Sequence, residues 1–200
     1  MAPLAAAQSR DIAFVISVSG PGVSPAEVEL DRLEKDLRTR GFSEAEIREA
    51  VDLMNLRYAV ARGGEPVETL LAAVEKVKDA PWLAYAPLPR SADSWLFAHW
   101  RNLPLDYDPA TVLGQLRVPV LALFGALDRN VLEPKNAERW KIALVQGGVK
   151  DSTVRVFPDG NHMLLEARTG ADEEYPTLQR FVPEYEPVLL HWLQQRRLAR

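Results

Sequence analysis

Cysteine is absent from this chain of 200 residues, which excludes disulfide bonds and a thiolate nucleophile. No apolar run approaches the roughly 18 residues that a membrane-spanning helix needs. The first residues lack the basic flank and the long apolar stretch of a secretory signal. The chain has 24 Lys and Arg residues and 28 Asp and Glu residues, which gives a net charge of −4. We therefore expect a cytoplasmic protein that binds neither membranes nor nucleic acids.

Several motifs of catalysis and cofactor binding are also missing. The sequence contains no Gly-x-Ser-x-Gly, the turn that presents a nucleophilic serine in many hydrolases. The glycines at Gly20, Gly22, Gly147 and Gly148 do not form a phosphate-binding loop, and no nucleotide fingerprint is present. No group of His, Asp and Glu has the spacing of metal ligands. We therefore expect neither a cofactor nor a metal ion.

The hydrophobic pattern that is present predicts an α/β fold. Hydrophobic residues make up 47% of the chain, enough for one sizeable core. Residues 12–18, 116–124 and 153–157 read as strands, and the first is a nearly continuous β-branched and aromatic run of the kind that is buried on both faces. Helices are predicted at 134–146 and 183–197. This alternation is typical of a parallel sheet of about three strands with flanking helices.

Between the first two strands the pattern becomes helical. Ser24-Pro-Ala-Glu27 and Ser43-Glu-Ala-Glu46 are capping boxes, and each should begin a helix. Consecutive helices without an intervening strand indicate an insertion rather than a crossover. The helices are predicted at 24–41, 43–63 and 66–78, with a short further candidate at 94–101. We therefore divide the chain into a core, residues 1–23 and 110–200, and a helical cap insertion, residues 24–109.

Asp128 and His162 are the candidate catalytic residues. Each follows a predicted strand, and in a parallel sheet the loops after neighbouring strands meet at the same edge. A carboxylate that binds one nitrogen of an imidazole fixes its tautomer and leaves the other nitrogen free to take a proton. Either residue alone could be structural, as a turn aspartate or an ordinary loop histidine. Together, in this order, they favour a catalytic pair.

The residues around this pair resemble a known family. Val118-Pro-Val-Leu-Ala-Leu-Phe-Gly-Ala-Leu-Asp128 and Phe157-Pro-Asp-Gly-Asn-His162 are similar to the acid and histidine segments of the α/β-hydrolase superfamily. The strand that ends in Ser-Val-Ser-Gly-Pro-Gly22 is similar to one in its dienelactone-hydrolase-like and serine-aminopeptidase-like branches. The resemblance implies a partial α/β-hydrolase fold, with Asp128 as the triad acid and His162 as the base. It places the serine elbow and the oxyanion loop before Met1, so a truncated hydrolase is expected.

Ser24 and Ser19 are the serines that could substitute for the missing nucleophile. Ser24 follows a strand, opens a helix and precedes Asp128 and His162 in the chain order of a hydrolase. Pro25 argues against it, because an oxyanion hole takes an N–H from the residue after the nucleophile and proline has none. Ser19 lies near the end of the same strand but has no flanking glycine on each side. The capping function of Ser24 is favoured.

Two functions and one partner remain as hypotheses. The first function is hydrolysis of small ester or acyl substrates by the His162 and Asp128 pair, at a low rate for lack of the serine and the oxyanion loop. The alternative is a non-catalytic hydrolase remnant that acts as a dimeric binding module. Residues 12–18 would form a strand with one unpaired edge, which must be covered to avoid aggregation. We therefore predict a homodimer through this strand.

Overall fold

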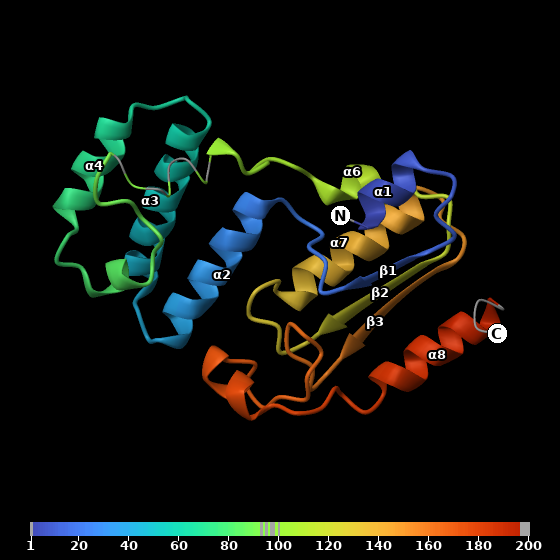
Figure 1. The fold of residues 1–200 in the computed structure, drawn as a ribbon. Helices are drawn as coiled ribbons and strands as arrows, with labels where there is room; N and C mark the ends of the chain where they lie inside the picture. Colours follow the sequence, from blue (N-terminus) through green and yellow to red (C-terminus); the bar gives the residue numbers. More distant parts are fainter. Residues whose placement is uncertain (1, 93, 95, 97–98, 100, 197–200) are drawn as a thin grey trace. The chain divides into compact units, whose positions relative to one another are not determined.

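The computed structural model describes residues 2–92, 94, 96, 99 and 101–196. Its elements confirm the α/β class, with a three-stranded parallel sheet and helices beside it (Figure 1). The chain divides into two compact units, one formed by Met1–Val23 with Asp108–Arg200 and the other by Ser24–Tyr107. Of the helices within the described residues, none is long and apolar enough to cross a membrane.

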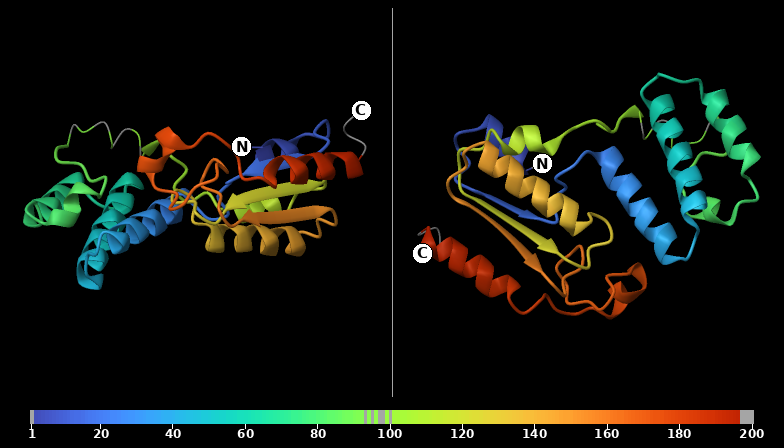
Figure 2. Two further views of the ribbon diagram at one scale, coloured as in Figure 1. Left: turned by 90° about the horizontal axis from the view of Figure 1, so that it is seen from below. Right: turned by 180° about the vertical axis from the view of Figure 1, so that it is seen from behind.

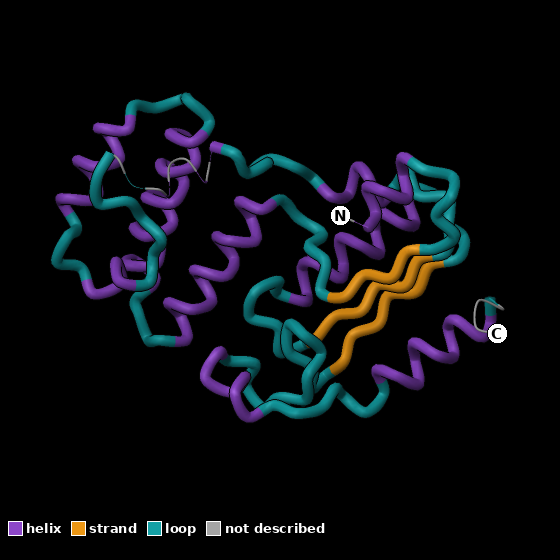
Figure 3. Tube along the Cα trace, in the orientation of Figure 1, coloured by secondary structure: helices purple, strands orange, loops and turns teal. Residues whose placement is uncertain are grey.

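The sheet of the first unit has the order β1 (Val15–Val18), β2 (Val120–Gly125) and β3 (Ser152–Phe157). All pairs are parallel, with Val15 opposite Val120 and Val120 opposite Ser152. The strands lie side by side in Figure 3. Every residue of β2 is buried, as expected for a central strand covered on both faces. The sheet therefore directs the ends of β2 and β3 to one edge, where loops follow both strands.

Two of the predicted strands are shorter than the apolar pattern suggested. Residues 12–14 are not paired, and the second strand begins at Val120 rather than at residue 116. Pro119 has no N–H to contribute to a ladder, although its carbonyl accepts a hydrogen bond from Val15. Leu116 N–H instead bonds back to Leu113 in a turn. The bonds between the two segments therefore begin at the Pro119 carbonyl, and its missing N–H leaves the residues before Val15 without a donor there.

Helices cover both faces of this sheet, and each face has its own cluster of buried apolar residues. Figure 2 shows α7 (Glu133–Gln146) and α8 (Tyr185–Gln195) on opposite sides of the strands. On one face Val120, Ala122 and Phe124 pack with Trp140 and other apolar residues of α7. On the other face Leu121 and Leu123 pack with Trp192 of α8. The helices of this unit are α1 (Ala2–Gln8), α6 (Pro109–Leu113), α7 (Glu133–Gln146), η2 (Asp172–Thr177) and α8 (Tyr185–Gln195).

The second unit contains the three helices that were predicted there, α2 (Pro25–Thr39), α3 (Glu44–Ala61) and α4 (Val67–Lys76), followed by η1 (Pro81–Ala84). The capping boxes predicted at Ser24 and Ser43 are both present. The candidate helix at 94–101 falls largely on residues that the structure does not describe. The unit has its own apolar core, in which helices α2, α3 and α4 each bury one face.

A charged group lies inside this helical core. Arg57 is fully buried, donates to the carbonyl of Pro87 at 3.1 Å and forms an ion pair with Glu29. The hydroxyl of Tyr58 donates to the same carboxylate at 3.0 Å. Burial is the main cause that raises the pKa of Tyr58 well above its ordinary value. A buried charge is tolerated only when it is paired in this way, so this network fixes how α2 packs on α3.

Candidate active site

The carboxylate of Asp128 is held by its own loop. Its side chain is fully buried just after β2. Oδ1 accepts hydrogen bonds from the backbone N–H of Asn130 at 2.8 Å and of Val131 at 2.9 Å. The Asp128 N–H in turn donates to the carbonyl of Gly125 at 3.1 Å. These bonds use one carboxylate oxygen to form a tight turn and leave Oδ2 directed elsewhere.

Oδ2 of Asp128 meets the imidazole of His162. Oδ2 and Nδ1 are 2.9 Å apart, although the two residues are 34 positions apart in the chain. The His162 side chain is 35% exposed while that of Asp128 is 0% exposed, so the pair lies at the surface with its carboxylate inside. The structure therefore brings the two predicted residues together. Because Nδ1 is committed to Asp128, Nε2 is the ring atom left for proton transfer.

The electrostatics of the pair favour a charged imidazole. The pKa of His162 is raised above its ordinary value, mainly by the hydrogen bond to Asp128, and partial burial only opposes this effect. A raised pKa means that the imidazolium is stabilised when a proton arrives on the ring. This property suits a base that must hold a proton between two steps of a reaction.

A close approach of the two loops makes this contact possible. The backbone of Gly125 lies directly against residues 160 and 161, and a Cβ at Gly125 would lie 2.2 Å from the Gly160 carbonyl oxygen. The Leu127 N–H donates to the same carbonyl at 2.9 Å. The residue at the end of β2 must therefore be glycine, and it fixes the loop after β3 beside the loop after β2.

Asn161 is a site residue that was not predicted. Its side chain is fully buried, and Oδ1 accepts from the backbone N–H of Met163 at 2.9 Å and of Leu165 at 3.0 Å. Leu164 within this turn has a φ of +58°, a left-handed conformation that costs free energy outside glycine. The Gly-Asn-His sequence after a strand is a turn signal. It could have suggested that Asn161 shapes the backbone on which His162 is carried.

Ser19, the weaker nucleophile candidate, lies in contact with the histidine loop. It is buried at the end of β1 with a φ of +48°, and its hydroxyl donates to the backbone carbonyl of His162 at 2.7 Å. The proton of this hydroxyl is therefore directed at a carbonyl oxygen rather than at the imidazole. The N–H of Ser19 donates to Leu123 of β2 at 2.8 Å. Ser19 thus ties the first strand, the second strand and the histidine loop together.

The hydroxyl of Ser24 caps the N-terminus of α2. Its Oγ accepts from the Glu27 N–H at 3.3 Å and donates to the Glu27 carboxylate at 2.9 Å. Ser24 belongs to the helical unit, whereas Asp128 and His162 belong to the other unit. The described residues contain no group of three or more His, Asp or Glu side chains that could hold a metal ion.

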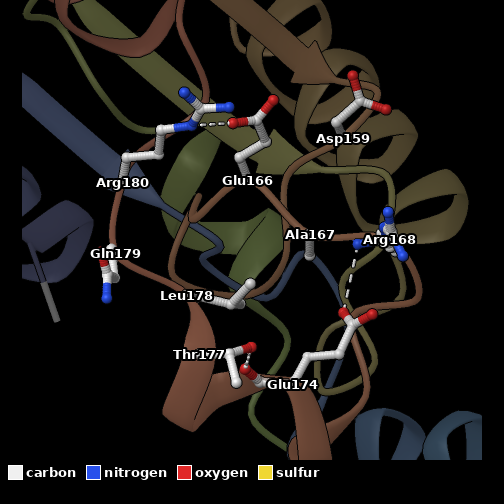
Figure 4. Close-up of a pocket in the computed structure, with 9 residues that line it drawn as sticks. All are labelled: Asp159, Glu166, Ala167, Arg168, Glu174, Thr177, Leu178, Gln179 and Arg180. Carbon is white, nitrogen blue, oxygen red and sulfur yellow. Dashed lines mark hydrogen bonds and ion pairs between the residues drawn. The ribbon is translucent and has the colours of Figure 1, made fainter.

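A cavity of about 730 Å³ lies in the same long connection that carries His162, between β3 and α8. Figure 4 shows the charged side chains around it, among them the ion pair of Glu166 with Arg180. Neither Asp128 nor His162 lines it. The cavity is lined by Asp159, Glu166, Ala167, Arg168, Glu174, Thr177, Leu178, Gln179 and Arg180.

Comparisons with known proteins give one similar structure. No protein-family model matches the chain, and a search of curated proteins found no match. The crystal structure of proline iminopeptidase from Mycobacterium smegmatis is similar with a TM-score of 0.44 and 16% sequence identity. The match covers 99% of this chain and 62% of that protein, so this chain spans less than two thirds of its length.

Proposed function

We propose that this chain is an α/β-hydrolase-like protein that hydrolyses small ester or acyl substrates with His162 and Asp128. One observation carries the proposal: Oδ2 of Asp128 lies 2.9 Å from Nδ1 of His162 at the carboxyl ends of adjacent parallel strands. The resemblance of the segments around both residues to the acid and histidine segments of that superfamily supports the same function. The substrate class and the catalytic role of the pair are inferences from this arrangement.

The pair would act as a general base on water. Nε2 of His162 takes a proton from a water molecule as the water oxygen bonds to the carbonyl carbon of the substrate. Asp128 stabilises the imidazolium that forms. The imidazolium then returns the proton to the leaving alkoxide as the bond from carbon to that oxygen breaks, and the products are a carboxylic acid and an alcohol. The hydroxyls of Ser19 and Ser24 are both engaged elsewhere, so the mechanism assigns neither a role as nucleophile.

Hydrolysis of 4-nitrophenyl acetate tests the proposal. We expect His162→Ala to lower kcat/KM about a hundredfold or more, because a positioned general base contributes at least that factor. His191→Ala is a matched control, since His191 is exposed on α8 and its ring forms a hydrogen bond with Gln195, a residue of the same helix. Ser24→Ala should leave the rate within about twofold, because its hydroxyl only caps a helix. Hydrolysis that persists in His162→Ala would refute the proposed mechanism.

A specific observation favours a second candidate function. In the described part of the chain, both candidate serine hydroxyls are bound away from the imidazole, so the pair lacks a serine partner there. A binding module without catalysis would keep the fold and bind acyl compounds without turning them over. In that case wild type and His162→Ala would show the same background hydrolysis while calorimetry still detected binding of a non-hydrolysable ester analogue.

We further propose that a second copy of the chain covers the open edge of β1. Within the described residues β1 pairs only with β2, and Val18 is 41% exposed. An unpaired strand edge is a template for pairing with another chain, and a lysine on it opposes such pairing. We expect sedimentation to show a homodimer whose dissociation constant rises about tenfold or more in Val18→Lys. Val145→Lys, at an exposed residue of α7, is the control and should leave the dimer intact. A wild-type monomer at micromolar concentration would contradict this proposal.

A further inference from the structure

Glu174 binds three consecutive backbone amides of its own chain. Its carboxylate accepts hydrogen bonds from the N–H of Arg168 at 3.3 Å, of Thr169 at 3.1 Å and of Gly170 at 3.1 Å. Figure 4 shows Glu174 reaching from η2 to the backbone of Arg168. Successive N–H groups of a turn form a concave site for an anion, and here the chain supplies that anion itself. We call residues 168–170 with the Glu174 carboxylate the clasp.

The clasp lies directly on the loop that carries Asp128. The carbonyl of Thr169 accepts a hydrogen bond from Nε of Arg129 at 3.0 Å. Gly170, with a φ of +68°, packs so closely on Leu127 that a Cβ would lie 1.8 Å from the Leu127 carbonyl oxygen. Leu127 and Arg129 are the two neighbours of Asp128 in the sequence. The clasp therefore contacts the Asp128 loop on both sides of the carboxylate.

We propose that Glu174 is a positioning residue that holds the Asp128 loop in the conformation that meets His162. Glu174 acts on Asp128 through a series of contacts. Its carboxylate binds the amides of residues 168–170, these residues contact Leu127 and Arg129, and Leu127 and Arg129 flank Asp128 in the chain. Glu174 itself touches neither the imidazole nor a reacting atom. The functional meaning of this proposal rests on the proposed function of the Asp128 and His162 pair. The contacts between Glu174, residues 168–170 and the Asp128 loop do not depend on that function.

The charge of Glu174 supports the clasp at neutral pH. Hydrogen bonds from the backbone lower the pKa of Glu174, with the Thr169 N–H as the largest cause. A depressed pKa means that the clasp contributes stability above the ordinary range of a glutamate and loses it as the pH falls through the lowered pKa. The carboxylate therefore stays ionised over the pH range in which His162 titrates.

Nuclear magnetic resonance of the full chain tests the proposal without an activity assay. In Glu174→Ala we expect amide exchange at residues 169 and 170 to accelerate about tenfold or more, since each amide loses its acceptor. The His162 pKa should fall toward its ordinary value because the bond to Asp128 weakens. Glu173→Ala removes a neighbouring exposed carboxylate of η2 and should change neither measurement. Sodium acetate, an external carboxylate for the vacated amides, should partly restore the His162 pKa in Glu174→Ala.

A second variant keeps the test valid if Glu174→Ala does not fold. Arg129→Ala removes the bond to Thr169 while the clasp keeps all of its own bonds, so it should lower the His162 pKa in the same direction. An unchanged His162 pKa in either variant, once that variant is shown to be folded, would overturn the proposal. Failure of the hydrolase proposal would appear instead as absent turnover with these shifts intact, so the two failures are distinguishable.

Discussion

Gly125→Ala is expected to lower the free energy of unfolding by about 3 kcal/mol or more. The new methyl group would lie 2.2 Å from the Gly160 carbonyl oxygen and 2.4 Å from that of Asn161. Both obstacles are backbone, so no side-chain rotation can relieve the clash. The loops must separate, which breaks the bond between Leu127 N–H and Gly160 and withdraws His162 from Asp128.

Urea unfolding followed by circular dichroism measures this loss. Gly114→Ala is a matched control in the same unit, because its Cβ would meet only ordinary contacts of 3.5 Å and longer at a φ of −66°. We expect this control to stay within about 0.5 kcal/mol of wild type. If the two alanine variants were equally stable, the close approach of the loops described for Gly125 would be wrong.

Asp128→Asn is expected to lower the rate of ester hydrolysis about a hundredfold or more. One side-chain oxygen must keep accepting from the N–H groups of Asn130 and Val131. The new NH₂ group is therefore forced toward His162, where it donates to Nδ1. The imidazole then carries its own proton on Nε2, which can no longer act as a base.

The pH dependence of the same variant gives an independent measurement. The bond to Asp128 raises the folded-state pKa of His162. The stability that this bond adds is therefore complete below the unfolded pKa of about 6.5 and is lost as the pH rises through the folded pKa. The gap in unfolding free energy between wild type and Asp128→Asn should then be larger at pH ~6 than at pH ~9. A gap that grows with pH would contradict the assigned cause of the shift.

The order of strands and helices followed from the sequence because each element has a local signal. The capping boxes at Ser24 and Ser43 determine where α2 and α3 begin, and such caps depend only on residues three positions apart. Strand lengths were less accurate, since a strand ends where its partner stops bonding. The start of β1 depends on Pro119, which lies more than a hundred residues away in the chain.

The candidate site was predictable to a similar degree. Asp128 and His162 each follow a strand, and adjacent parallel strands deliver their loops to one place, so the sequence indicated both residues. Their catalytic role stays a prediction. Glu174 was missed because its partners are backbone amides, which carry no sequence signal. Asn161 was missed although the Gly-Asn-His turn signal after a strand marks it. Ser19 was considered as a weak nucleophile candidate, and its hydroxyl donates to the backbone carbonyl of His162 in the structure.

The Asp128 and His162 pair has a consequence for how the protein can be altered. Both residues lie within the continuous segment that runs from β2 through α7 to the loop after β3. The pairing of β2 with β3 brings the two residues together within this segment, and the clasp at residues 168–174 follows it closely in the chain. Neither requires closure across residues 24–107. The helical unit could therefore be exchanged for another while one continuous stretch, residues 120–174, keeps Asp128, His162 and the clasp together.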